Sequence, residues 1–231
     1  MKKLFSVILL AAVCLSAAAQ ESKLLNDWQD KIEINDNSVV SSFSHFTFFY
    51  NHNLNAQNVE GLTASGLGFE ISTLYLGFRP WNGGRLALGL VDFCLDKSYL
   101  DKGYLNAYSK IKNAVLPTPI PANFGFSNIN GTVTSFAFLF PLAFVQEFGK
   151  GQIALMAAPG VGWNSYFNEY LEDDVVKHRT RLTFDKGGAY FRLNLSAFFW
   201  YSHIGVGVRY SFLPNMQAGP GVVSVGLSIG I

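Results

Sequence analysis

The chain has 231 residues, of which 49% are hydrophobic, 15% aromatic and only 14% charged, and its formal net charge is +1. This length suits one good-sized domain. A charged fraction well below the roughly 25% of soluble domains excludes a disordered or highly charged solvating chain. Because there is no basic excess to displace counterions, a nucleic-acid-binding role is also excluded.

The N-terminal residues have the pattern of a secretory signal. Two lysines precede the apolar run 4–15, and three alanines at 17–19 provide a cleavage site. We therefore predict that residues 1–19 are a cleaved signal peptide and that the mature chain starts at Gln20. Lipidation on Cys14 is an alternative that the bulky residue before this cysteine disfavours.

Residues 20–38 form a separate N-terminal segment. Leu24, Leu25, Trp28 and Ile32 stand at helical spacing within it. This spacing predicts a short helix that covers one end of the following domain or docks a partner.

The rest of the chain, residues 39–231, alternates between apolar and polar side chains with the period of β-strands. No run of 18 apolar residues follows the signal, so no transmembrane helix is predicted. Pro141 cannot donate to a strand ladder, and we expect a bulge or local break there. The eight predicted strands span 39–51, 67–80, 84–95, 132–146, 151–164, 189–199, 204–212 and 223–231.

The connections between these strands alternate strictly in length. The short ones include glycine-rich turns that suit tight hairpins, so we predict up-and-down antiparallel order with every long loop at one end. The long connections are 52–66, 96–131, 165–186 and 214–220, and the short ones are 81–83, 147–150 and a turn near 201–202.

An eight-stranded barrel of this kind is either a soluble ligand carrier or a membrane barrel with lipid outside. Long apolar faces, small and polar residues on the opposite faces, and aromatic residues at both strand ends favour the membrane form. The sequence thus predicts an all-β, eight-stranded antiparallel up-and-down transmembrane β-barrel. The aromatic residues expected to face the membrane interfaces are Trp81, Trp200 and Tyr201 near the short turns and Trp163, Tyr166 and Phe167 near the long loops.

The chain resembles the small eight-stranded outer-membrane β-barrel proteins of Gram-negative bacteria. The likeness lies in the overall pattern, including the amphipathic last strand 223–231, although this strand ends in Ile231 rather than the aromatic residue common in that family. The Ala-Ala-Ala-Gln signal ending is similar to signals of Bacteroidota. The resemblance implies a monomer in the outer membrane, inserted by the barrel-assembly machinery and in contact with outer-membrane lipids and lipopolysaccharide.

A few charged residues fall on the inward faces of the predicted strands. An arginine facing lipid near the midplane costs roughly 2–4 kcal/mol, so Arg192 and Arg209 are expected to point inward. Glu70 is their candidate partner, and Arg85 lies near the short-turn rim. We predict a structural charge network in the lumen, with a proton or ion path as the alternative. A lumen filled by side chains makes diffusive porin activity unexpected.

The longest connection, 96–131, is the candidate for a functional surface. A tyrosine-rich part, with Tyr99, Tyr104 and Tyr108, is expected to form a short helix near 100–112. Prolines at 117, 119 and 121 then predict a stiff, extended stretch. The alternatives are a surface that contacts a partner and a variable cover; the residues we single out are Tyr99, Tyr104, Tyr108, Pro117, Pro119 and Pro121.

Signatures of catalysis, metals and cofactors are weak. In Ser202-His203 and Ser44-His45 the two side chains point to opposite faces of a strand, so neither pair is expected to act together. An acidic run in the connection 165–186 is followed at once by basic residues, which favours a solvated charge run over a cation site. We predict a non-enzymatic protein without metal or cofactor, with a structural or surface-interaction role.

Two alternative functions stay open. A conduit for small hydrophobic molecules predicts a lateral opening near Pro141 or Pro159. An outer-membrane lipid-modifying enzyme predicts a serine, a histidine and an acid that converge at the outer rim.

Overall fold

The computed structural model describes most of residues 44–230. The described ranges are 44–57, 59–81, 83–111, 114–121, 123, 125–182, 189–213 and 221–230. The predicted signal peptide 1–19 and the segment 20–38 lie outside them. Within these ranges, no helix is long and apolar enough to cross a membrane.

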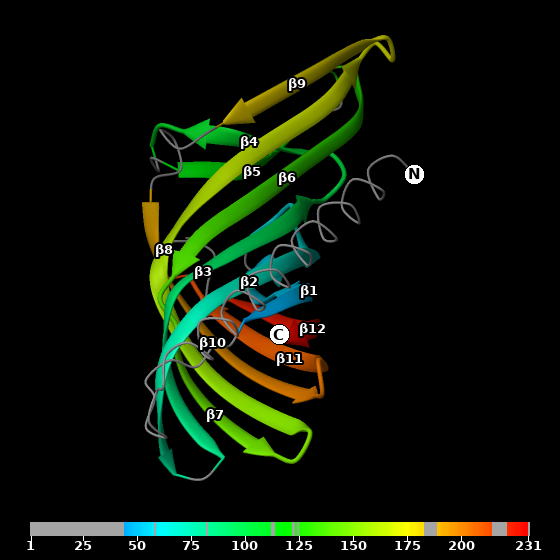
Figure 1. The fold of residues 1–231 in the computed structure, drawn as a ribbon. Helices are drawn as coiled ribbons and strands as arrows, with labels where there is room; N and C mark the ends of the chain where they lie inside the picture. Colours follow the sequence, from blue (N-terminus) through cyan, green and yellow to red (C-terminus); the bar gives the residue numbers. More distant parts are fainter. Residues whose placement is uncertain are drawn as a thin grey trace.

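The strands close into an antiparallel barrel (Figure 1). Strands β6 and β7 follow one another along a single position between β3 and β8, and β12 pairs with β1 to close the wall, which gives eight positions. The predicted fold class is thereby confirmed. The wall strands are β1 (His45–Asn53), β2 (Leu62–Trp81), β3 (Gly84–Leu100), β6 (Phe126–Leu139), β7 (Leu142–Phe148), β8 (Gly151–Glu172), β10 (Ala189–Tyr201), β11 (Ile204–Phe212) and β12 (Val222–Gly230).

Side chains alternate between an apolar outer face and a polar or small inner face. In β10, Phe191 and Leu195 are exposed, whereas Arg192 and Asn194 are buried in the lumen. Strands β11 and β12 continue the same pattern. The barrel is therefore apolar outside and polar inside, the reverse of an ordinary soluble domain.

The predicted interruption at Pro141 separates β6 from β7. The Phe140 N–H donates to the Pro159 carbonyl at 2.8 Å, and the Gly89 N–H donates to the Pro141 carbonyl at 2.7 Å. Both neighbouring strands thus stay hydrogen-bonded to the chain across the break, and the wall is not opened there.

Strand β3 carries one extra residue opposite this break. Leu88 pairs with Leu142 and Asp92 pairs with Leu139, so three residues of β3 face two of the neighbouring chain. Leu90 and Val91 are both exposed as a result. A one-residue shift exchanges the faces of a strand, and every second residue from Asp92 onward faces the lumen.

The wall is uneven in height. Strands β2 and β8 have 20 and 22 residues, whereas β1, β11 and β12 have 9 each. At the loop end, β8 continues into a hairpin with β9 (Val176–Leu182), and β4 (Tyr104–Ser109) pairs with β5 (Ala114–Pro119). We call β9, the β4–β5 hairpin and the adjoining ends of β6 and β8 the extension; it rises above the other strands in Figure 1.

The helix predicted near 100–112 is wrong, because the tyrosine-rich part forms strand β4. The proline stretch is extended through Pro119, as predicted, and forms the partner strand β5. The connection 165–186 contains β9 and the last residues of β8. The connection after β1 contains a short 3-10 helix, η1 (Leu54–Gln57).

Candidate functional site

Four charged side chains from four strands meet in the middle of the lumen, and we call them the ionic layer. Arg192 Nη2 and Arg209 Nη2 donate to the two oxygens of Asp96, each at 2.5 Å. Arg209 Nη1 also donates to Glu70 Oε2 at 3.1 Å. Two guanidinium groups and two carboxylates balance in charge, as buried ions require.

Neutral side chains complete the ionic layer. Asn51 donates to Asp96 at 2.7 Å. Arg192 donates to Asn194 at 2.8 Å and to Ser211 at 2.9 Å. Donors of both arginines and acceptors of Asp96 are thus engaged by groups fixed on the wall, which holds the layer in one arrangement.

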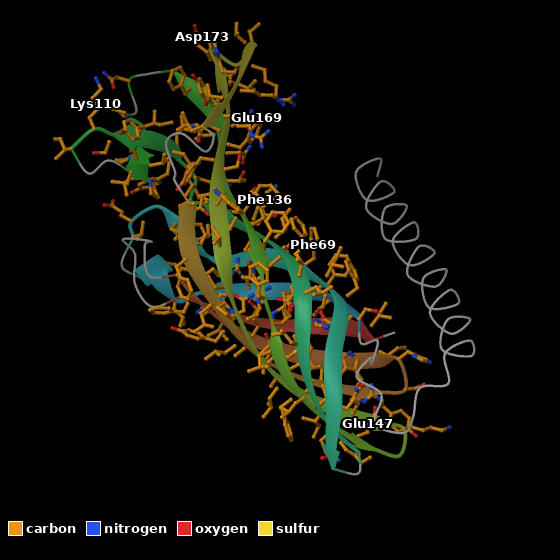
Figure 2. The ribbon with its side chains drawn as sticks, turned by 60° about the vertical axis from the view of Figure 1, so that its left-hand side comes forward. Phe69, Lys110, Phe136, Glu147, Glu169 and Asp173 are labelled. Carbon is orange, nitrogen blue, oxygen red and sulfur yellow. The ribbon has the colours of Figure 1, made fainter. Side chains whose placement is uncertain are left out.

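The structure brings Glu70, Arg192 and Arg209 together, but it places Arg85 elsewhere. Arg85 forms its ion pair with Glu147, near the turns between strands. Figure 2 shows Glu147 at the end of the barrel opposite the extension. The charges of the lumen therefore form one central layer and one separate pair at the short-turn rim.

Sequence reasoning missed Asp96, the residue that joins both arginines. The predicted strand ended at residue 95, whereas β3 continues to Leu100. Charge balance could have indicated Asp96, because two inward arginines need two carboxylates and Glu70 supplies only one.

An aromatic layer fills the lumen on the short-turn side of the ionic layer. The rings of Phe198 and Trp200 stack with centroids 4.9 Å apart, and His45 lies 4.6 Å from Phe198. The indole of Trp200 donates to Ser228 at 3.0 Å. Trp200 is 1% exposed, so its predicted place in an interfacial girdle is wrong.

Glycines of the neighbouring strand make room for these inward rings. A Cβ atom on Gly207 would lie 2.4 Å from the ring of Phe198, and one on Gly205 would lie 2.5 Å from the ring of Trp200. The glycines at alternate positions of β11 therefore provide the space that the rings of the aromatic layer occupy.

The β4–β5 hairpin packs against the loop-end parts of β2, β3, β6 and β8. Val115 of this hairpin packs with Leu62, Leu100, Val133 and Tyr166. Tyr166 is buried in this cluster, which corrects its predicted interfacial position. The described interior thus holds packed side chains at three levels, as expected for a barrel of eight strands.

Two asparagines attach the hairpin to the wall. The backbone N–H of Asn106 donates to the side-chain oxygen of Asn168, and the amide of Asn168 donates to the backbone carbonyl of Asn106, both at 2.8 Å. Both residues are buried. This reciprocal pair fixes the hairpin to β8.

The singled-out loop residues have separate places. Tyr99 belongs to β3, Tyr104 donates to Glu60 at 2.6 Å, and Tyr108 packs against the hydrophobic cluster of the hairpin. Pro117 and Pro119 lie in β5. Pro121 follows that strand and is exposed. Tyr104 packs against that cluster as well, so Tyr104 and Tyr108 lie together on β4.

The hairpin of β8 and β9 carries exposed ion pairs. Glu169 accepts from Lys177 at 2.7 Å and from Arg179 at 2.8 Å. These hydrogen bonds, the one from Lys177 first, hold the pKa of Glu169 below its usual value. Among the described residues, no group of three or more His, Cys, Asp or Glu is arranged to hold a metal ion.

The catalytic suspects are dispersed. His45 lies inside the barrel, 3.4 Å from Glu70 and 2% exposed, while Ser202 and His203 are exposed in a short turn. At the loop end, His178 bonds to Glu172 at 2.7 Å, a contact that the sequence gave no reason to expect. No serine of the described chain hydrogen-bonds to His178.

No family model and no curated protein matches the sequence. Three solved structures of small outer-membrane proteins are similar in fold. Ail of Yersinia pestis has 9% identity and a TM-score of 0.40, with 83% of this chain and 99% of that chain covered. The outer-membrane enzyme PagL has 12% identity and a TM-score of 0.41, with 81% and 98% covered. Neisserial surface protein A has 14% identity and a TM-score of 0.41, with 82% and 94% covered. This likeness concerns the fold alone and assigns no activity.

Proposed function

We propose that the protein is a monomeric, non-enzymatic barrel of a Gram-negative outer membrane that presents the extension as an interaction surface. The observation that carries this proposal is a filled, closed barrel from which one ordered structure projects at one end. A rigid scaffold with projecting loop-end elements is the usual design of a binding surface.

The outer face supports the membrane location. Large apolar side chains remain exposed on the wall strands, where a soluble protein would lose solubility. A belt of this kind matches the hydrocarbon layer around a membrane barrel. It includes Phe48, Leu67, Leu88, Phe138, Leu155, Phe191, Val206 and Leu227.

The unequal lengths of the connections support an orientation in which the extension faces outward from the cell. Outer-membrane barrels have short periplasmic turns and longer extracellular loops. The extension lies at the end of the long connections, which supports a position on the cell surface. The described wall strands form a closed ring in which β12 pairs with β1, and this favours a monomer within the membrane.

The filled lumen supports a surface role over transport. The wall around Pro141 and Pro159 is closed by backbone hydrogen bonds, so nothing there favours the lateral opening of a hydrophobic conduit. His45 and His178 likewise give no particular support to the lipid-modifying alternative, because His45 is enclosed and His178 hydrogen-bonds to no described serine.

Membrane insertion is tested by gel mobility of the outer-membrane fraction with and without boiling. A folded barrel is expected to migrate faster before boiling. A soluble periplasmic protein with unchanged mobility would overturn the proposal.

The surface role is tested by replacing the β4–β5 hairpin, residues 104–119, with a short turn. Cells with the intact protein are compared with cells carrying this variant for binding to host-cell or bacterial surfaces. We expect binding to be lost while the mobility shift remains. Unchanged binding by a correctly inserted variant would exclude the hairpin as the interaction surface.

A further inference from the structure

The outer face of the tall strands gains basic and hydroxyl residues toward the loop end. Leu95, Phe136 and Trp163 lie side by side on β3, β6 and β8. Two residues further along each strand, the same face carries Lys97, Thr134 and Ser165, which are also paired in register. Figure 2 shows Phe136 and Phe69 on the wall below Glu169. A row with one lysine and two hydroxyl groups thus directly follows this apolar row, and the next row on the same face carries Tyr99, Thr132 and Phe167.

Strand β9 enlarges this basic row. Arg181 pairs in register with Phe167, and its Nε donates to Ser165 at 3.0 Å, which places its guanidinium on the outer face. Arg179 and Lys177 follow at two-residue intervals on β9 and therefore share that face. We call Lys97, Lys177, Arg179 and Arg181 the basic face.

The basic face has more positive charge than its own carboxylates neutralise. Glu169 takes both Lys177 and Arg179 as partners. Within the described part of the chain, neither Lys97 nor Arg181 forms an ion pair with a carboxylate. Four cations stand against one carboxylate, so the face is a site for an anion.

The other side of the barrel lacks this feature. The described strands β1, β10, β11 and β12 carry only two arginines, Arg192 and Arg209, and both point into the ionic layer. Among the described strands, the outward basic charge at the loop end therefore lies on one side of the barrel, which favours a localised binding site over a general attraction to the membrane surface.

We propose that the basic face binds the phosphate groups of lipid A, the phosphorylated glycolipid of the outer leaflet. This proposal rests on the membrane location and orientation proposed above. Acyl chains would pack against the aromatic row, and the headgroup phosphates would then lie at the level of Lys97 and Arg181. Guanidinium groups bind phosphate through paired, charge-assisted hydrogen bonds, and Thr134 supplies a further hydroxyl donor.

The spacing of the site suits more than one phosphate. Lys97 and Ser165 are separated by two interstrand steps, about 10 Å. Arg181 is anchored on Ser165, so two cationic centres lie about that far apart along the rim of the apolar belt. A headgroup with two separated phosphates can engage both centres at once.

The test compares two triple variants of the full-length folded protein in nanodiscs. Lys97→Gln/Arg179→Gln/Arg181→Gln removes the excess charge of the face. Lys102→Gln/Lys110→Gln/Lys150→Gln removes the same charge from exposed positions outside the face; Figure 2 shows Lys110 on the hairpin, away from Glu169. Binding of lipid A and of dephosphorylated lipid A is measured by native mass spectrometry.

We expect the wild type and the control variant to prefer phosphorylated lipid A equally. The basic-face variant should bind it about tenfold or more weakly, which corresponds to the loss of one good charge-assisted hydrogen bond. Equal binding by the two variants, or equal binding of dephosphorylated lipid A, would overturn the proposal. Equally tight binding of soluble polyphosphate would overturn the lipid as the ligand.

Failure of this inference is separable from failure of the proposed function. The mobility shift on boiling reports the inserted barrel for each variant before any lipid is added. An inserted barrel without phosphate preference refutes the basic face alone, whereas a protein that never inserts refutes the membrane location.

Discussion

The ionic layer and the ion pairs of the β8–β9 hairpin use the same groups in opposite environments. Arg192 contacts Asp96 at 2.5 Å, and Arg179 contacts Glu169 at 2.8 Å. The side chain of Arg192 is 1% exposed, whereas that of Arg179 is 62% exposed. Loss of one partner should therefore destabilise the fold more in the ionic layer than in the β8–β9 hairpin. Only the buried charges have no water to replace the lost partner.

The largest effect is expected from Asp96→Ala, because it removes the shared partner of two buried arginines. Breaking a buried ion pair typically costs about 3–5 kcal/mol. The free energy of unfolding is measured by urea titration in lipid vesicles. Asp101→Ala, at an exposed position just beyond β3, is the matched control. A variant as stable as this control would show that the ionic layer does not stabilise the barrel.

Asn168→Ala tests whether burial matters in the absence of charge. This change removes the side chain that accepts from the backbone N–H of Asn106 and donates to its backbone carbonyl, each at 2.8 Å, and leaves both buried backbone groups with fewer partners. The expected cost is about 1–3 kcal/mol, felt first as release of the β4–β5 hairpin. Hydrogen exchange of β4 should speed up while that of β10 stays slow. Equal exchange rates in β4 and β10 would show that the hairpin is not released separately from the barrel.

Glu147→Gln probes an intermediate environment. The side chains of Arg85 and Glu147 are 17% and 31% exposed, between the two clusters compared above. Loss of this pair is expected to cost about 1 kcal/mol or less, measured by the same urea titration. An effect as large as that of Asp96→Ala would mean that exposure does not rank the ion pairs of this barrel.

The sequence predicted the barrel because alternation reports strands directly. The runs 189–199 and 204–212 match β10 and β11 closely. The extra residue of β3 was not predictable in this way, because a bulge exchanges the faces of the strand without changing its composition. The predicted strand also ended at residue 95, so Asp96 was assigned to a loop although β3 continues to Leu100.

The extension shows a second limit of prediction from sequence. Prolines at 117 and 119 are compatible with an extended chain but do not indicate its partner, and β5 uses them in a two-stranded edge pairing with β4. Trp200 was misplaced for another reason. Interfacial girdles and lumen packing both use aromatic residues, and only the parity of the residue, set against Gly205 and Gly207, distinguishes them.

The smallest effect is expected at Glu169, and it should appear in a titration rather than in unfolding. Because the pKa of Glu169 in the folded protein is lowered by Lys177 and then Arg179, its ionised form stabilises the folded state above the ordinary glutamate pKa of about 4.3. That stabilisation is lost as the pH falls through the lower folded value.

Carbon-13 NMR of labelled glutamate checks this sign. Glu169 should titrate below the ordinary value in the wild type and move toward it in Lys177→Gln, while the unfolding curves of the two proteins coincide. High salt should reduce the shift, because exposed pairs are screened. A titration at the ordinary value in the wild type would mean that the β8–β9 ion pairs do not persist in solution. The cations of the basic face would then be unpaired. Glu169 would affect their attraction for phosphate no more than a distant carboxylate does.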